Sequence, residues 1–275
     1  MSSKNPRTLH CKKSATIIEE MEGSFNSFIF TEDLKNGQCK TKGLCFKDRR
    51  VVFSEEKESQ DSSYINASYI DGFKQPKAYI ITKTPDSKAT IHNFWKMIWE
   101  HQTEIIVMLN KPEGDEKGLI YWNLEVGSTL CCGKLKVKTV IVEPKYSFEQ
   151  TKLLLTHEDG GSLFIDHFLF KSWPRVYTLP SSDDFYKLIN AVTNKIPNGY
   201  NSQKVIHCSD GLNRSRVFVD VDISIYRIQK TNEVNFSSIN SKLDHEVFNR
   251  SQHAWYYCFC YVVLMFYLTH SIKKE

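Results

Sequence analysis

The chain has 275 residues, of which 41% are hydrophobic and 25% are charged, enough to bury one large core or two small ones. Its formal net charge of +4 is small and its Lys and Arg residues are dispersed, which gives no support for a nucleic-acid partner but is compatible with an anionic ligand. Because no Pro-, Ser- or Gly-rich linker and no repeat divides the sequence, we expect a single domain over residues 1–275.

The N-terminal segment MSSKNPRTLHCKKS lacks the apolar core of a signal peptide, so we expect a chain kept in the reducing cytoplasm. The cysteines agree with this expectation, because none forms a C-x-x-C pair or the Cys/His spacing of a zinc site. We therefore predict free, mostly buried thiols, with no metal and no cofactor. The eight cysteines are at positions 11, 39, 45, 131, 132, 208, 258 and 260.

Segments rich in β-branched and aromatic residues alternate with segments of helical periodicity along the chain. Residues suited to N-caps precede the helical segments, and THEDGGS between two strand-like runs predicts a hairpin turn. This order predicts an α/β domain with a mixed sheet. In chain order the predicted elements are strand 78–82, helix 89–101, strands 104–109, 135–142, 152–156 and 163–170, helix 181–196, strand 204–208 and helix 214–229.

The C-terminal run AWYYCFCYVVLMFYL, residues 254–268, is almost wholly apolar. It is shorter than the roughly 20 residues that a bilayer span needs, so we expect no membrane span. The run predicts a buried helix. Its lack of polar positions leaves a contact surface as the alternative.

The stretch VIHCSDGLNRSR, residues 205–216, combines a buried strand, a tight turn and the start of a helix. The amide groups of such a loop and the positive end of the helix dipole converge on one point, which favours a phosphate dianion and a thiolate at Cys208. Arg214 would bind two phosphate oxygens through its planar guanidinium, and Ser215 would help the sulfur to leave a phosphocysteine intermediate. The alternative is a buried cysteine and a surface arginine that merely lie six residues apart.

HCSDGLNRS resembles the signature loop of the cysteine-dependent protein tyrosine phosphatases, His-Cys-x-x-Gly-x-x-Arg followed by Ser or Thr. Other segments are similar to the tyrosine-specific branch, in the expected order and over a core of about residues 24–270. The resemblance implies the fold of that family, a central mixed twisted sheet flanked by helices, with Cys208 as nucleophile. The similar segments are SSYINASYIDGF, AYIITKTP, NFWKMIWEH, EKG at 116–118, YW at 121 and 122, WP at 173 and 174, and Gln252.

The same resemblance implies roles for the residues around the nucleophile. His207 would orient the loop and tune Cys208, and Gln252 would position the hydrolytic water. His167 lies in an apolar strand and is expected to be a satisfied core residue. The residues whose backbone would bind phosphate are Ser209, Asp210, Gly211, Leu212 and Asn213.

The general acid is the main departure from the family's pattern. In the family a Trp-Pro-Asp segment carries this acid, and here Arg175 stands in its place. Arginine stays protonated and cannot deliver the proton that a leaving tyrosine oxygen needs, and such a loss costs about 10²–10⁴ in rate. Asp183 and Asp184 are alternative acids, but they precede a helix and are better explained as caps.

Four further positions also differ from the family's pattern. Lys40 replaces the tyrosine that stacks on the substrate ring, which removes an aromatic wall and adds a positive charge. Asp210 would repel an incoming phosphate if its carboxylate points inward, and Arg216 is expected to offset that charge. Asn213 replaces a glycine and tolerates a positive φ better than most residues.

These features leave three functions open. The first, which we favour, is an inactive or very weakly active phosphatase-like protein that binds phosphotyrosine-containing proteins through the loop from Cys208 to Arg214. The second is a slow phosphatase on phosphoinositides or other phosphoesters, because Lys40, Lys83 and Arg175 would surround an anionic head group. CSDGLNR also resembles the loop of myotubularin-type phosphoinositide phosphatases, but this resemblance stops at the loop and Asn213 replaces its candidate acid. The third is a scaffold with a relic pocket.

A compact domain with a degenerate site also resembles the tyrosine phosphatase-like proteins of parasitoid-wasp bracoviruses. This narrower resemblance implies a virulence role, the suppression of host immune cells by interference with phosphotyrosine signalling in the host-cell cytoplasm. We expect a monomer.

Overall fold

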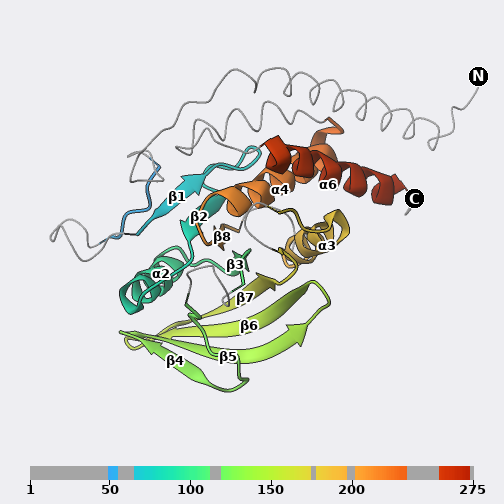
Figure 1. The fold of residues 1–275 in the computed structure, drawn as a ribbon. Helices are drawn as coiled ribbons and strands as arrows, with labels where there is room; N and C mark the ends of the chain where they lie inside the picture. The colour runs from blue at the N-terminus through green and yellow to red at the C-terminus, as the bar shows by residue number, and fades with distance from the viewer. Residues whose placement is uncertain are drawn as a thin grey trace, which may run out of the picture.

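A mixed sheet of eight strands forms the centre of the structure, a computed structural model that describes residues 49–54, 65–111, 119–174, 178–196, 202–233 and 254–272 (Figure 1). The strands are β1 (Ala67–Ile70), β2 (Tyr79–Lys83), β3 (Ile105–Met108), β4 (Thr129–Cys132), β5 (Leu135–Pro144), β6 (Phe148–His157), β7 (Ser162–Phe170) and β8 (Lys204–Cys208). Their order across the sheet is β1-β2-β8-β3-β7-β6-β5-β4. Neighbours among β2, β8, β3 and β7 are parallel and the remaining neighbours are antiparallel, so the predicted mixed sheet is confirmed.

Helices cover both faces of the sheet. The described helices are α2 (Lys88–Glu100), α3 (Ser182–Thr193), α4 (Asn213–Thr231) and α6 (Ala254–Ile272). α3, α4 and α6 pack on one face and α2 packs on the other (Figure 1). Because successive side chains of a strand alternate between faces, Val205 of β8 joins the cluster around α2 whereas Ile206 joins the cluster around α4. β8 is therefore buried on both faces.

All the strands and helices predicted from sequence are present, with ends shifted by a few residues. β1 and β4 are absent from the predicted elements, because neither contains the continuous run of β-branched and apolar residues that predicts the equally short β3. The N-cap residues are Ser87 for α2 and Ser181 for α3. Asp183 and Asp184 lie in the first turn of α3, where their negative charges interact favourably with the positive end of the helix dipole.

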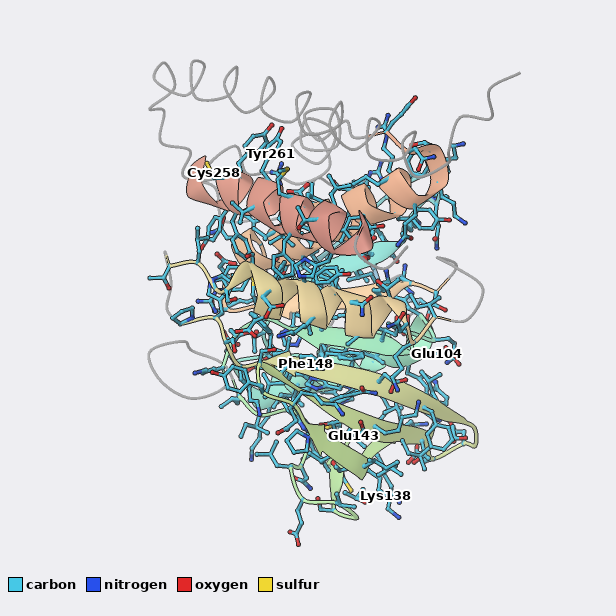
Figure 2. All side chains as sticks on the ribbon, turned by 90° about the vertical axis from the view of Figure 1, so that its right-hand side faces the viewer. Glu104, Lys138, Glu143, Phe148, Cys258 and Tyr261 are labelled. Atoms are coloured by element: carbon cyan, nitrogen blue, oxygen red, sulfur yellow. The ribbon has the colours of Figure 1, made fainter. Side chains whose placement is uncertain are left out.

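The C-terminal helix α6 packs on α3 and α4, as the sequence predicts. Phe259 is almost fully buried in this contact, whereas Val262 is 52% exposed, and the alternative of a contact surface stays a prediction. In Figure 2, Cys258 of α6 lies at the opposite end of the molecule from Lys138 of β5. Within the described residues, no helix has both the length and the apolar character needed to cross a membrane.

The cysteines of the described residues are free thiols, as expected. Cys132, Cys208 and Cys260 are buried, whereas Cys131 is exposed on β4. In the same part of the chain, no group of His, Cys, Asp and Glu side chains is arranged to hold a metal ion.

A buried ion pair connects β8 to α4. Lys204 Nζ lies 2.5 Å from Asp222 Oδ2, and both side chains are 1% exposed. The hydroxyl of Tyr79 on β2 donates to the same carboxylate oxygen at 2.8 Å. Since each charge is shielded from water, the pair fixes the start of β8 against the middle of α4 only as long as both partners are present.

We predict that Lys204→Met lowers the free energy of unfolding by about 3–5 kcal/mol, because it leaves the Asp222 carboxylate buried without its cation. Chemical denaturation followed by circular dichroism measures this. The double variant Lys204→Met, Asp222→Leu should recover much of the loss. Lys187→Met removes a solvent-exposed partner of Asp183 and serves as the control, with little expected change. Equal effects for both lysine variants would contradict the prediction.

Candidate functional site

The loop between β8 and α4 is held tightly against the end of β2. Thr84 N–H donates to the carbonyl oxygen of Cys208 at 2.9 Å, and Gly211 N–H donates to the same oxygen at 3.0 Å. Gly211 has a φ of +75°, and a Cβ there would lie 2.5 Å from the backbone nitrogen of Lys83. This position therefore requires glycine for both its conformation and its close contact.

The sulfur of Cys208 is fully buried inside this loop. Ser215 Oγ donates a hydrogen bond to Cys208 Sγ at 3.2 Å, the contact that the sequence led us to expect, although the role of Ser215 in phosphate release stays a prediction. On its other side the thiol donates to Asp210 Oδ1 at 3.1 Å. The sulfur thus lies between a hydroxyl donor and a carboxylate acceptor.

The carboxylate of Asp210 points into the loop, which settles the orientation that the sequence left open. Its Oδ1 accepts the backbone N–H groups of Leu212 at 2.8 Å and Asn213 at 3.1 Å, in addition to the Cys208 thiol. Its Oδ2 accepts the side-chain amide of Asn213 at 2.6 Å. Two of the amides expected to bind a phosphate therefore donate to a carboxylate of the chain itself.

The surroundings of Cys208 oppose the thiolate that the sequence predicts, and the reactive state of the sulfur stays a prediction. Burial raises the pKa of the Cys208 thiol to about 12, the Asp210 charge adds to the rise, and the hydrogen bond from Ser215 opposes it. The helix dipole and the loop amides favour the anion. Asp210 accepts two of those amides, which weakens their support for a thiolate.

Arg214 is 3% exposed, which excludes the alternative of a surface arginine that merely lies six residues after the cysteine. Its Nη1 donates to the carbonyl oxygen of Leu109 at 3.1 Å, just after β3. Its guanidinium lies over the ring of Trp173, 5.1 Å from the centroid. These contacts hold the guanidinium in place, and no sequence pattern predicts the Leu109 contact.

Arg216 is buried and paired within α4. It is 1% exposed, and its Nε lies 3.8 Å from Asp220 Oδ2 one turn along the helix. Burial and Asp220 raise the pKa of Cys260 on α6, and the positive charge of Arg216 opposes this rise. The expectation that Arg216 offsets the charge of Asp210 stays a prediction.

His207 is part of a fully buried chain of hydrogen bonds on the α2 face of the sheet. Thr84 Oγ1 donates to Asn110 Oδ1 at 2.7 Å, so at 2.9 Å it accepts Nδ1–H of His207. His207 Nε2 then accepts the Tyr121 hydroxyl at 2.6 Å, and Tyr121 accepts Nε2–H of His167 at 2.7 Å. Burial, with a smaller effect of His167, lowers the pKa of His207 well below its ordinary value. A neutral His207 supports the loop but supplies no positive charge to Cys208.

His167 is only partly satisfied, which corrects the expectation of a fully paired core histidine. Its Nδ1 has no hydrogen-bond partner among the described residues, and neither has Nε1 of Trp122, whose ring centroid lies 4.2 Å away. Burial lowers the pKa of His167 to about 3. The histidine therefore stays neutral in the folded protein over the physiological pH range.

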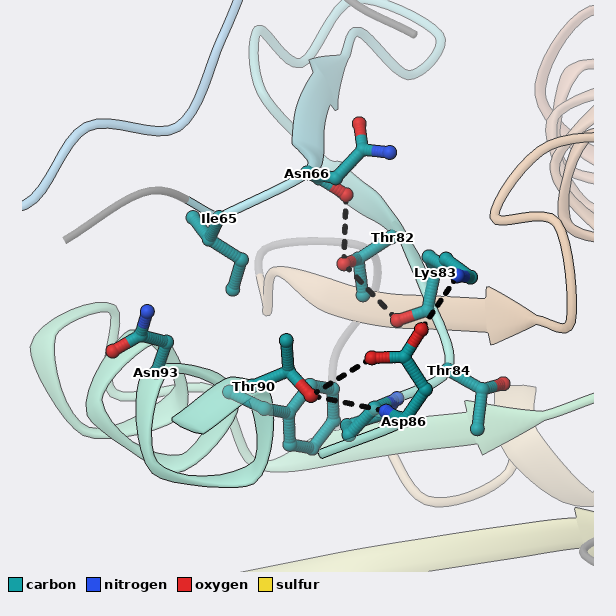
Figure 3. Close-up of a pocket in the computed structure, with 10 residues that line it drawn as sticks. Ile65, Asn66, Thr82, Lys83, Thr84, Asp86, Thr90 and Asn93 are labelled. Carbon is teal, nitrogen blue, oxygen red and sulfur yellow. Dashed lines mark hydrogen bonds and ion pairs between the residues drawn. The ribbon is translucent and has the colours of Figure 1, made fainter. Parts of the chain in front are cut away.

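A pocket of about 220 Å³ lies beside the loop (Figure 3). Lys83 and Thr84 line one wall, and the remaining lining residues come from β2, α2 and the segments next to β1 and α2. The Nζ of Lys83 lies 2.7 Å from Asp86 Oδ2, so its charge is already paired. This pairing weakens the earlier suggestion that Lys83 would contact an anionic head group.

Some candidate residues lie outside the described residues, namely Lys40, Arg175 and Gln252. Their proposed roles stay predictions. Within the described residues, the structure brings together Cys208, Asp210, Leu212, Asn213 and Ser215. Arg214 directs its guanidinium to the Leu109 carbonyl and the Trp173 ring. The side chains of Asp183 and Lys187 form a surface pair on α3, which supports the helix-terminal role of Asp183.

Comparison with known proteins gives consistent matches. The family model described as protein-tyrosine phosphatase matches residues 36–266. The chain is 29% identical to "Tyrosine phosphatase H2" of Microplitis demolitor bracovirus (isolate Webb), over 94% of this chain and 82% of that protein. It is 32% identical to human "Tyrosine-protein phosphatase non-receptor type 9", over 80% of this chain and 40% of that protein. Both resemblances inferred from the sequence, to the phosphatase family and to the bracovirus proteins, are thus confirmed.

We predict that Gly211→Ala destabilises the protein by more than about 2 kcal/mol, because it adds backbone strain and a clash with the Lys83 backbone. Gly127→Ala is the matched control, since Gly127 also has a positive φ of +88° but has no atom within 4 Å of the added Cβ. Thermal denaturation of both variants separates strain from contact. Equal losses of stability in the two variants would show that the close contact with the Lys83 backbone does not constrain the loop.

We predict that acid weakens the fold through His167. Its folded-state pKa of about 3 lies below the ordinary value of 6.5, so the unfolded chain binds the proton first. The contribution of His167 should therefore lower the free energy of unfolding by about 1.4 kcal/mol for each unit that the pH falls between pH 6.5 and pH 3. His167→Gln can still bond Tyr121 but cannot titrate, so urea titrations between pH 4 and 7 should show a smaller slope. An unchanged slope would contradict this assignment.

Proposed function

This chain belongs to the protein-tyrosine phosphatase family, and on that premise we propose that it binds phosphotyrosine-containing proteins while hydrolysing phosphate esters very slowly or not at all. Binding to such partners would shield their phosphotyrosines from active phosphatases. The bracovirus relatives carry the name tyrosine phosphatase, and the proposed role is interference with phosphotyrosine signalling in the host-cell cytoplasm.

The single observation that carries this proposal is the position of the Asp210 carboxylate against the Cys208 sulfur. The thiol donates to Asp210 Oδ1 at 3.1 Å. The thiolate is the nucleophile in cysteine chemistry, and both burial and the Asp210 charge raise the pKa of the Cys208 thiol. Asp210 does not act as a base for the sulfur, because a carboxylate is a far weaker base than a thiolate.

The sequence around the acid position supports the same conclusion. Arg175 stands where the family carries its general acid. A phenolic leaving group departs as an anion unless it receives a proton, and a guanidinium does not release one at working pH. The nucleophile and the acid are therefore both compromised, by independent causes.

The groups that bind phosphate without reacting are retained. Arg214 is held between the Leu109 carbonyl and the Trp173 ring. Gly211 gives the loop the tight turn that directs backbone amides towards one point, at the start of the long helix α4. Recognition of a phosphate needs this framework and does not need a thiolate or an acid.

We predict that the wild-type protein turns over p-nitrophenyl phosphate no faster than Cys208→Ser, while it binds phosphotyrosine peptides in calorimetry. Arg214→Met should weaken this binding at least about tenfold, because it removes a charge-assisted hydrogen-bond donor. Lys136→Met, an exposed lysine on β5, is the control and should bind as the wild type does.

Two results would overturn the proposal. Turnover that depends on Cys208 would identify an enzyme, and tests on phosphoinositides and other phosphoesters would then define its substrate. If the protein binds no phosphotyrosine peptide and Arg214→Met changes nothing, the alternative of a scaffold with a relic pocket would remain.

A further inference from the structure

We infer that Asp210 is a built-in competitor for the phosphate site, whose carboxylate occupies the loop and must turn outward before a phosphate group binds. This inference rests on the proposed function and concerns the regulation of that same site. It identifies one residue of the chain as the determinant of its affinity for phosphate.

The hydrogen bonds of Asp210 are those that a bound phosphate oxygen would need. Oδ1 accepts two backbone amides of the loop, from Leu212 and Asn213, and the thiol of Cys208 as well. An N–H group donates fully to only one strong acceptor at a time. A phosphate oxygen and the Asp210 carboxylate therefore compete for the same donors, and their like charges exclude joint occupancy.

Displacement of this carboxylate does not require the loop to unfold. Asp210 is an exposed residue, and its hydrogen bonds in the loop are with residues two or three positions away in sequence. The loop itself is held by other contacts, from Thr84 N–H to Cys208 and from Arg216 N–H to Leu212. The carboxylate can thus turn into water while the backbone keeps its shape.

Competition of this kind lowers affinity in a predictable way. If the loop is open for only a fraction of the time, the apparent dissociation constant is the intrinsic one divided by that fraction. A phosphate dianion compensates for the displacement, since it offers several oxygens and can engage Arg214 as well as the amides. A ligand with a single carboxylate gains nothing over Asp210, so the site should select dianions.

The contrasting explanation is that Asp210 only caps the N-terminus of α4. Asp and Asn are about equally good at capping, because either side chain offers an oxygen to the backbone amides. Asp210→Asn therefore keeps the cap and removes the charge, whereas Asp210→Ala removes both. A capping role would leave Asp210→Asn like the wild type in every property.

The test compares wild type, Asp210→Asn and Asp210→Ala, with Asp183→Asn as a matched change in the first turn of another helix. One measurement is the pH dependence of alkylation of Cys208 by iodoacetamide, with the Cys208 peptide resolved by mass spectrometry so that other cysteines do not interfere. The other is calorimetric affinity for inorganic phosphate and for a phosphotyrosine peptide.

We expect both Asp210 variants to be alkylated at Cys208 at least about tenfold faster than the wild type at pH 8, because a nearby anion no longer disfavours the thiolate. Phosphate and peptide should bind about 10–100-fold more tightly to Asp210→Ala, the range expected for hydrogen bonds to a charged group. Asp183→Asn should match the wild type in all measurements.

The outcomes separate this inference from the proposed function. If the wild type binds the peptide but Asp210→Ala binds it no more tightly, the competitor role is wrong and the proposed function stands. If Asp210→Ala gains affinity for inorganic phosphate but no variant binds the peptide, the competitor role stands and the proposed function is wrong. If no variant binds phosphate in any form, both are wrong.

Discussion

The placement of β8 between β2 and β3, covered on both faces, is the constraint from which the site follows. Since side chains alternate along the strand, His207 faces α2 and Cys208 faces α4. The first therefore joins a buried hydrogen-bond chain, and the second reaches the start of a helix. A shift of one residue in the register would exchange the two and abolish the loop chemistry. The buried pair of Lys204 and Asp222 fixes the strand against α4 and opposes such a shift.

The carboxylate of Asp210 determines the charge and the hydrogen bonding of the loop between β8 and α4. The loop amides and the N-terminus of α4 attract negative charge, and Asp210 supplies it from within the chain. Burial and the Asp210 charge both raise the pKa of the Cys208 thiol. Under the proposed function, slow catalysis and weakened anion binding would then have a common cause, although the first concerns a proton and the second a set of hydrogen-bond donors.

The sequence predicts the strands and helices well, because their apolar periodicity reflects the same burial that the fold requires. It does not predict the inward turn of Asp210, since a side-chain rotamer depends on which of several donors the carboxylate reaches. Arg216 shows an intermediate case. Its pairing with Asp220 is visible as an i,i+4 spacing, but its burial depends on tertiary contacts. Thr84 is hydrogen-bonded to Asn110 and to His207, both far away in sequence, so no local sequence pattern predicts these bonds.

Under the proposed function, two separate features would slow catalysis, and they act on different protons. Burial and Asp210 raise the pKa of the Cys208 thiol, and the absence of a general acid at position 175 would cost about 10²–10⁴ in rate. Restoring an acid alone would leave the thiol pKa raised, and lowering that pKa alone would leave a phenolic oxygen without its proton. Phosphate binding needs neither a thiolate nor an acid, because it would depend on Arg214, the loop amides and the displacement of Asp210.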